Sequence, residues 1–103
     1  MTPRASTMNT TRPAKRFALG EIVSTRGALA ALQKAGQSPL PFLLRHATGD
    51  WGEVGKDDWQ ANDEALETGE RLLSSYRTSL GVSIWIITEH DRSVSTLLLP
   101  DEY

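Results

Sequence analysis

The last third of the chain contains three short apolar runs separated by polar breaks. RLLSSYR (71–77) is followed by the turn-like TSLG, VSIWIIT (82–88) is followed by EHDRS, and VSTLLL (94–99) ends at Pro100. β-Branched and aromatic residues are frequent in these runs, and the connections are short and rich in turn-forming residues. The pattern predicts three strands in an antiparallel meander, so the rest of the chain must supply the layer that covers the sheet.

The middle run is expected to lie at the centre of the sheet. Ile84 and Ile86 alternate with Trp85 and Ile87, so both faces of this strand are apolar. The final run is a candidate edge strand, and an uncovered edge offers unpaired amides to another chain. A homodimer formed through an edge such as residues 94–99 is therefore expected.

A strand and a helix are predicted upstream. FALGEIVST (17–25) is interpreted as a short strand. Ser24 or Thr25 is suited to cap a helix over 26–35, because its hydroxyl can accept a hydrogen bond from a free amide, and Gly36 is suited to end that helix. The apolar stripe of this helix is Ala28, Leu29, Ala31, Leu32 and Ala35.

A second helix is predicted to begin with Ser38 as its cap and Pro39 as its first residue, where a missing amide proton costs nothing. It is expected to run to Ala47, with Arg45 on its flank and His46 near its end. Its buried face is expected to be Leu40, Leu43, Leu44 and Ala47.

A third helix is predicted in the middle of the chain. Asp57 and Gln60 have the spacing of a capping box, and Gly69 stands where the helix is expected to end. Its buried face is expected to be Trp59, Asn62, Ala65 and Leu66. Asn62 is the polar member of that face, and we expect the preceding GDWG turn to supply its hydrogen-bond partners.

The order β, α, α, α, β, β, β predicts an α+β fold, in which two to three helices pack on one face of a small antiparallel sheet. A chain of 103 residues has room for one domain, which we expect to span residues 17–103. Residues 1–16 carry four basic residues and no apolar run of the kind that a secretory signal contains. They are interpreted as a flexible basic tail.

Charge is distributed unevenly along the chain. Residues 1–49 contain seven basic residues and one acidic residue, whereas residues 50–103 contain four basic and twelve acidic residues, for a net charge of -2. This asymmetry is typical of a chain that presents a basic segment to nucleic acid or an acidic face to a cationic partner.

Two absences in the sequence narrow the possible chemistry and location. The chain has no cysteine, which excludes disulfides and thiolate chemistry and fits a reducing cytoplasm. No apolar run approaches the roughly 18 residues of a membrane span. We expect a cytoplasmic protein that makes no membrane contact.

The segment RHATGDWG (45–52) concentrates polar and aromatic residues at the end of the second predicted helix and in the loop that follows it. Gly49, Asp50 and Trp51 are expected to form a structural turn. Trp51 is expected to close the core, and Asn62 is expected to hold the turn in place.

A catalytic site, if the protein is an enzyme, is expected where the second helix ends. His46 is the best candidate proton carrier because an unperturbed imidazole titrates near neutrality, and Arg45 and Arg92 are candidate phosphate clamps. The strands are expected to bring further polar side chains to the same place, namely Ser74, Tyr76 and Thr88. The alternative for His46 is a structural role at the helix C-terminus. The sequence does not decide whether the protein is an enzyme.

Four segments carry a resemblance to a known family. They are RHATGDWG (45–52), Asn62 with Ala65-Leu66 and Gly69, LLSSY (72–76) and IWIITEHDRSVSTLLLPDEY (84–103). Over about residues 17–103 the chain resembles a family of small bacterial proteins found on plasmids and integrative elements. The resemblance implies a mobile-element setting and no defined activity. Family members often carry a label as a type I restriction subunit, although so short a chain has no room for a methyltransferase or nuclease domain.

More loosely, the order of elements is similar to that of RelE-type and barnase-type ribonuclease toxins. This second resemblance implies RNA cleavage that uses His46 and Arg92. The acidic balance of the chain beyond its tail does not favour it, because RNA-binding enzymes need basic side chains to contact phosphates.

The predicted third helix has an acidic outer face. Its carboxylates, including one just beyond the helix, are Asp58, Asp63, Glu64, Glu67 and Glu70. Such a face is suited to docking on a cationic host protein or to mimicking a polyanion, and a merely solvated helix face is the structural alternative. We expect a small accessory protein of mobile elements that binds a protein or nucleic-acid partner, with a ribonuclease toxin as the alternative.

Other chemistries have no motif in this chain. His46 and His90 are far apart and belong to no HExxH motif, and neither a GxSxG elbow nor a P-loop is present. We therefore expect neither a metal site nor a cofactor.

Overall fold

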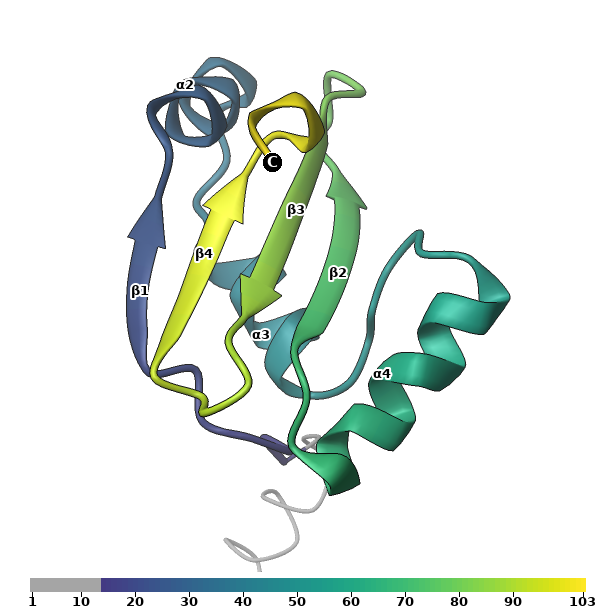
Figure 1. Cartoon of the computed structure of the whole chain (residues 1–103). Coiled ribbons are helices and arrows are strands. Elements are labelled where there is room, and N and C mark those ends of the chain that lie inside the picture. The colour runs from purple at the N-terminus through teal and green to yellow at the C-terminus, as the bar shows by residue number, and fades with distance from the viewer. Residues whose placement is uncertain (1–13) are drawn as a thin grey trace, which may run out of the picture.

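The structure, a computed structural model, describes residues 14–103. The elements in chain order are β1 (Glu21–Ser24), α2 (Arg26–Ala35), α3 (Leu40–Ala47), α4 (Lys56–Thr68), β2 (Leu72–Arg77), β3 (Ser83–Thr88), β4 (Val94–Leu98) and the 3-10 helix η1 (Pro100–Glu102). The predicted α+β class and the C-terminal three-stranded meander are both confirmed (Figure 1). Most of the predicted basic tail, residues 1–13, lies outside the described residues.

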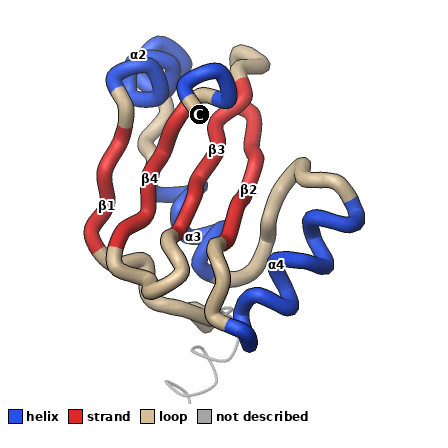
Figure 2. The backbone as a smooth tube through the Cα atoms, viewed as in Figure 1, coloured by secondary structure: helices blue, strands red, loops and turns tan. Residues whose placement is uncertain are grey.

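The four strands form one sheet in the order β1-β4-β3-β2 (Figure 2). β3 pairs antiparallel with both β2 and β4, which confirms its predicted central position. β1 runs parallel to β4, so the sheet is mixed. The expectation that residues 94–99 form an edge is wrong, because β1 covers that side of β4.

β1 is shorter than the predicted strand over residues 17–25. Gly20 has a left-handed φ of 67°, and a Cβ on it would lie 2.3 Å from the carbonyl oxygen of Ser93. The chain turns into the sheet at this glycine, because only a residue without a side chain fits there. Phe17 consequently lies outside the sheet and packs against His46 and Trp51.

α2 has the predicted bounds. The Thr25 side chain accepts a hydrogen bond from the amide of Ala28, and Gly36 ends the helix with a φ of 68°. Ala28 and Leu32 are buried as expected, whereas Leu29 lies at the border of the apolar stripe and stays 43% exposed.

α3 begins at Leu40, one residue after the predicted start, and buries a different face. The Ser38 hydroxyl accepts a hydrogen bond from the amide of Leu40 at 3.1 Å. Leu40 and Leu44, which were expected to be buried, are largely exposed. The face turned toward the sheet is Phe42, Leu43, His46 and Ala47. This rotation buries the aromatic ring and gives the imidazole hydrogen-bond partners on the sheet, and both effects outweigh the cost of exposing two leucines.

α2 and α3 cover one face of the sheet, and α3 lies behind the strands in Figure 1. The side chains that meet there form the main core, which comprises Ala28, Leu32, Phe42, Leu43, Tyr76, Ile84, Ile86 and Leu97. Alternate residues of β2, β3 and β4 contribute to it, as the period of two in a strand requires.

α4 lies beside β2, at the border of the sheet (Figure 1). The predicted capping box is wrong: the cap is Gly55, which has no side chain, and Gln60 bonds instead to Glu64. A second core cluster of Trp51, Ala65 and Leu72 joins this helix to the sheet, and Trp59 and Leu66 pack against it as predicted. No helix in residues 14–103 is both long and apolar enough to cross a membrane.

The outer edge of β2 is covered by other parts of the chain. The amide of Ser75 donates to Trp51, and the amide of Glu53 donates to Ser75, so residues 51–53 run along this edge. The Asn62 side chain completes the cover by bonding to both the amide and the carbonyl of Leu73. The expectation that Asn62 bonds to the GDWG turn is therefore wrong, because the free backbone groups of the strand are its partners.

Both ends of the described chain are attached to the fold. The amide of Arg16 donates to the carbonyl of Ala47 at 2.8 Å. At the other end, Glu102 accepts hydrogen bonds from the Thr25 hydroxyl at 2.5 Å and from the Leu99 amide at 2.7 Å.

Candidate functional site

The end of α3 turns sharply within RHATGDWG. Gly49 has a φ of 89°, and the amide of Asp50 donates back to the carbonyl of Arg45. The Asp50 carboxylate accepts hydrogen bonds from the Arg45 guanidinium at 2.7 Å and from the amide of Gly52 at 3.1 Å. The local sequence thus folds into a turn that is braced by its own side chains.

Arg45 and Tyr76, two residues of the predicted catalytic set, lie together. The Arg45 guanidinium lies over the Tyr76 ring, 4.6 Å from its centroid, and the Tyr76 hydroxyl donates to the carbonyl of Asp50 at 2.6 Å. Burial raises the pKa of Tyr76, and the hydrogen bond to Asp50 raises the pKa of Arg45. The same hydrogen bond lowers the pKa of Asp50. These groups hold one another in the turn, with the phenol protonated.

His46 lies in the interior and is 0% exposed. Its Nδ1 is 2.5 Å from the Ser74 hydroxyl and its Nε2 is 2.8 Å from the Thr88 hydroxyl. Phe17 and Trp51 pack edge-on around the imidazole, with ring centroids at 5.2 and 5.5 Å. The structure thus brings together three of the six polar residues that the sequence placed at the helix end, namely His46, Ser74 and Thr88, and encloses them.

The hydrogen bonds around His46 continue through a chain of hydroxyls. Thr88 lies 2.7 Å from the hydroxyl of Ser95, which donates at 2.7 Å to the carbonyl of Leu19. We call His46, Ser74, Thr88 and Ser95 the His46 cluster. It joins α3, β2, β3 and β4 to the segment before β1. Ser95 and Leu19 were not expected here, because their meeting depends on the parallel pairing of β1 with β4.

This chain of donors assigns the tautomer of His46. Ser95 gives its only proton to Leu19, so Thr88 must donate to Ser95 and must accept a proton from Nε2 of His46. Nδ1 then accepts from Ser74. Burial, aided by the positive charge of Arg92, lowers the pKa of His46 from 6.5 to about 3. The imidazole is neutral near pH 7, and both of its nitrogens are occupied.

Arg92, the other predicted clamp, is held at the end of α4. Its guanidinium donates to the carbonyls of Ala65 at 2.9 Å and Glu70 at 2.6 Å, and it lies over the ring of Phe17. Its φ of 61° is left-handed, which is rare for a residue with a side chain. Arg92 therefore caps the C-terminus of α4 and does not join the His46 cluster as a hydrogen-bond partner.

The five predicted binding residues all lie on the exposed side of α4 or just beyond it. We call Asp58, Asp63, Glu64, Glu67 and Glu70 the acidic α4 surface. Asp63 has a structural contact as well, since it accepts a hydrogen bond from the indole of Trp51 at 2.9 Å. The ion pairs within residues 14–103 use other carboxylates, those of Asp50, Glu53 and Glu89.

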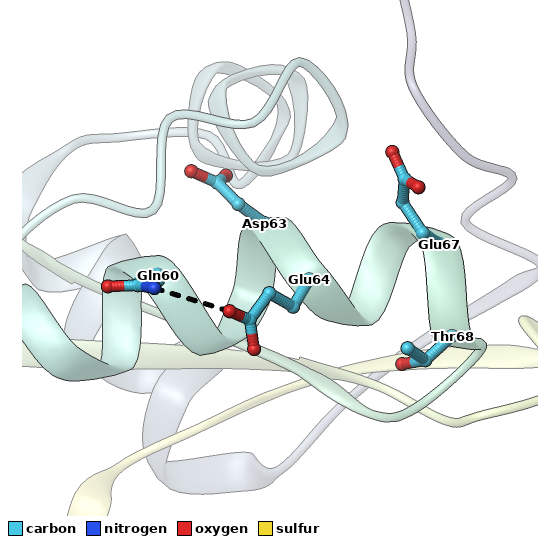
Figure 3. A pocket seen from close by; sticks show the side chains of 5 residues that line it. All are labelled: Gln60, Asp63, Glu64, Glu67 and Thr68. Atoms are coloured by element: carbon cyan, nitrogen blue, oxygen red, sulfur yellow. Dashed lines mark hydrogen bonds between the residues drawn. The ribbon is translucent and has the colours of Figure 1, made fainter.

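An open hollow of about 400 Å³ lies against this surface. Its described lining residues are Gln60, Asp63, Glu64, Glu67 and Thr68, all on α4 (Figure 3). The sequence predicted the carboxylates but assigned Gln60 to a cap and did not single out Thr68. The available signal was spacing. Gln60 and Thr68 stand three or four residues from the acids between them, and residues at these intervals lie on the same face of a helix.

No group of three residues suited to hold a metal ion occurs within residues 14–103. Comparisons with protein-family models, with curated proteins and with solved structures found no match to this chain.

Proposed function

We propose that the protein is a binding protein that docks a positively charged protein partner on the acidic α4 surface. One observation carries this proposal: three carboxylates, those of Asp63, Glu64 and Glu67, line one open hollow. None of them forms an ion pair with a basic side chain in residues 14–103. They are therefore available to a cation that comes from outside the described part of the chain.

The geometry favours arginine or lysine as the complementary side chain. α4 is fixed to the sheet by Asn62 and Ala65, so its carboxylates are presented in a defined arrangement. A guanidinium binds carboxylates through paired hydrogen bonds, and the amide of Gln60 and hydroxyl of Thr68 add further polar contacts. An acidic surface repels nucleic-acid phosphates, so a basic protein segment is the partner that fits.

The geometry of residues 14–103 does not favour the alternative of a ribonuclease. General acid–base catalysis needs the imidazole within reach of the substrate, whereas His46 is enclosed and both its nitrogens are bonded. Arg92 is engaged with backbone carbonyls. A binding role requires no change in either group.

The expected cytoplasmic location and mobile-element setting remain predictions. The lack of cysteine fits the reducing cytoplasm, and the sequence motifs described above support the mobile-element setting. In that setting, the partner on the acidic α4 surface is expected to be a host protein.

The test is to add an arginine-rich peptide to the full chain and to measure binding through the NMR chemical shifts of the protein's backbone amides. We expect shifts confined to α4 and weaker binding as salt is raised from about 0.05 to 0.5 M, because exposed charges are screened. The double variant Glu64→Lys/Glu67→Lys should lose the binding.

For the single variant Glu67→Lys, a matched control is Asp101→Lys, which changes the net charge by the same amount at an exposed acidic residue on η1, far along the chain from α4. It should bind the peptide as the unmodified chain does. Equal binding by the double α4 variant would show that this surface does not hold the peptide, and equal losses in Glu67→Lys and Asp101→Lys would show that net charge and not this surface attracts it. Capture from a bacterial lysate with the same variants would then identify the natural partner.

A further inference from the structure

Within the described residues 14–103, β1 is the edge of the sheet that no other segment covers. The opposite edge, on β2, is covered by residues 51–53 and by Asn62. No described strand or helix lies beyond β1 (Figures 1 and 2). Ile22 and Val23 on this strand are 44% and 38% exposed. An uncovered edge with apolar side chains is a template for another strand.

The backbone groups of β1 point alternately toward and away from the sheet. The amides of Glu21 and Thr25 donate to carbonyls of the β4 segment at 2.9 and 3.0 Å. Val23 also faces β4, whereas Ile22 and Ser24 face the other way, because neighbouring residues of a strand direct their hydrogen-bonding groups to opposite sides. Ile22 and Ser24 therefore present two amides and two carbonyls outward.

We propose that a second copy of this chain pairs with β1, antiparallel, about a twofold axis that passes by Val23. In this register Ile22 of each copy lies opposite Ser24 of the other. All the outward amides and carbonyls of both strands are then hydrogen-bonded. A register centred on Ile22 would instead need hydrogen bonds from Gly20, whose left-handed φ takes it out of the strand.

The side chains of β1 are complementary to themselves in this register. Val23 meets Val23 of the second copy, so two exposed apolar side chains cover each other. Glu21 lies opposite Thr25 of the second copy and thus beside its Arg26. Glu21 and Arg26 are both exposed, and neither side chain has a hydrogen bond or ion pair with another residue in the described range 14–103.

Charge complementarity is what selects a second copy as the occupant. Any extended peptide can satisfy the backbone of an open edge. With a twofold axis, Glu21 of each copy lies beside Arg26 of the other, so an ion pair forms at each end of the paired strands. The sheet then continues through both copies, and the open edge of each is removed. The acidic α4 surface, beside β2 at the other border of the sheet, stays free.

The first experiment is amide hydrogen exchange of the full chain, measured by NMR from about 10 µM to about 1 mM, together with sedimentation. We expect a dimer whose formation slows exchange at Ile22 and Ser24 as concentration rises. The amide of Val23, which faces β4, should show no such dependence. A chain that stays monomeric to 1 mM, or a dimer with unprotected Ile22 and Ser24, would overturn the proposal.

Two sets of variants test the register. Ile22→Pro removes the outward amide and leaves the hydrogen bonds to β4 in place, so it should give a folded monomer, whereas Ile22→Thr should still dimerise. Glu21→Arg and Arg26→Glu should each weaken dimerisation about tenfold, since two exposed ion pairs become repulsive. The double variant Glu21→Arg/Arg26→Glu should recover it, and a double variant weaker than both single ones would exclude this register.

Discussion

The His46 cluster and the acidic α4 surface are both groups of polar residues, but they are arranged in opposite ways. The side chains of the cluster are 0% exposed and bonded to one another or to backbone. No buried side-chain nitrogen or oxygen within the described range 14–103 lacks a partner. The carboxylates of α4, by contrast, are exposed, and most of them have no partner there.

This difference bears on which group serves the fold and which group we propose to bind a partner. A buried polar group must be hydrogen-bonded, and once its partners are in place it specifies how the elements meet. The imidazole of His46 does this for α3 and the sheet. An exposed unpaired charge contributes little to folding and is free to meet a partner. Stability should therefore depend on the cluster, and binding on α4.

Among the substitutions, the largest effect is expected for His46→Ala. The variant leaves a cavity and removes the partner of the Ser74 hydroxyl, so we expect a loss of about 3 kcal/mol in the free energy of unfolding. Urea denaturation measures it. His90→Ala, at an exposed position in the turn before β4, should change stability by less than about 0.5 kcal/mol. Similar losses in both variants would contradict the structural role of His46.

Acid should weaken the fold through the same imidazole. Burial lowers the pKa of His46 to about 3 from its usual 6.5, so between these values the unfolded chain binds a proton that the folded chain does not. Stability is fully present above about pH 6.5 and falls by up to about 1.4 kcal/mol per pH unit as the pH drops toward 3. Urea denaturation of the unmodified chain and of His46→Gln at several pH values in this range gives, for each, the slope of the free energy of unfolding against pH. Equal slopes would show that His46 is not responsible.

Arg92→Ala is expected to cost about 2 kcal/mol, because the capping hydrogen bonds to Ala65 and Glu70 are lost. Arg92→Gly loses the same hydrogen bonds but relieves the left-handed backbone. It should therefore be about 1 kcal/mol more stable than Arg92→Ala. Thermal unfolding of the two variants separates the loss of the hydrogen bonds from the strain of the backbone at residue 92. A glycine variant less stable than Arg92→Ala would show that this backbone is not strained.

The smallest effect is expected on the acidic α4 surface. Glu67→Lys places a cation near the C-terminus of α4 and removes a like charge three residues from Glu64, so stability should rise by about 0.5 kcal/mol. Lys34→Glu, in the last turn of α2, is the mirror control and should lower stability by a similar amount. A destabilised Glu67→Lys would mean that the acidic surface serves the fold after all.

Local signals predicted most of the elements. Thr25 and Gly36 bound α2 as their chemistry requires, and the three C-terminal runs became β2, β3 and β4. Predictions that depend on tertiary packing were wrong. The buried face of α3 differs from the predicted one because Phe42 and His46 find partners on the sheet. The spacing of apolar residues along the helix carries no information about those partners.

The candidate residues were found more readily than their surroundings. Spacing on a helix placed Glu64 and Glu67 outward, and alternation along strands brought Ser74 and Thr88 to one face. The enclosure of His46 was not predictable, because it needs Phe17, a residue from outside the sheet, to cover the imidazole. Likewise, no local rule indicates that Arg92 reaches back to the carbonyls of α4.

The sequence by itself determined the α+β class, the meander, both ends of α2 and the acidic face of α4, since each follows from neighbouring residues. Only the tertiary structure decided that β1 joins β4 in parallel, that β2 is covered while β1 stays open, and that the most reactive side chain of RHATGDWG is buried. The physical reason is that these outcomes depend on contacts between residues far apart in the chain, where burial and hydrogen bonding outweigh local preference.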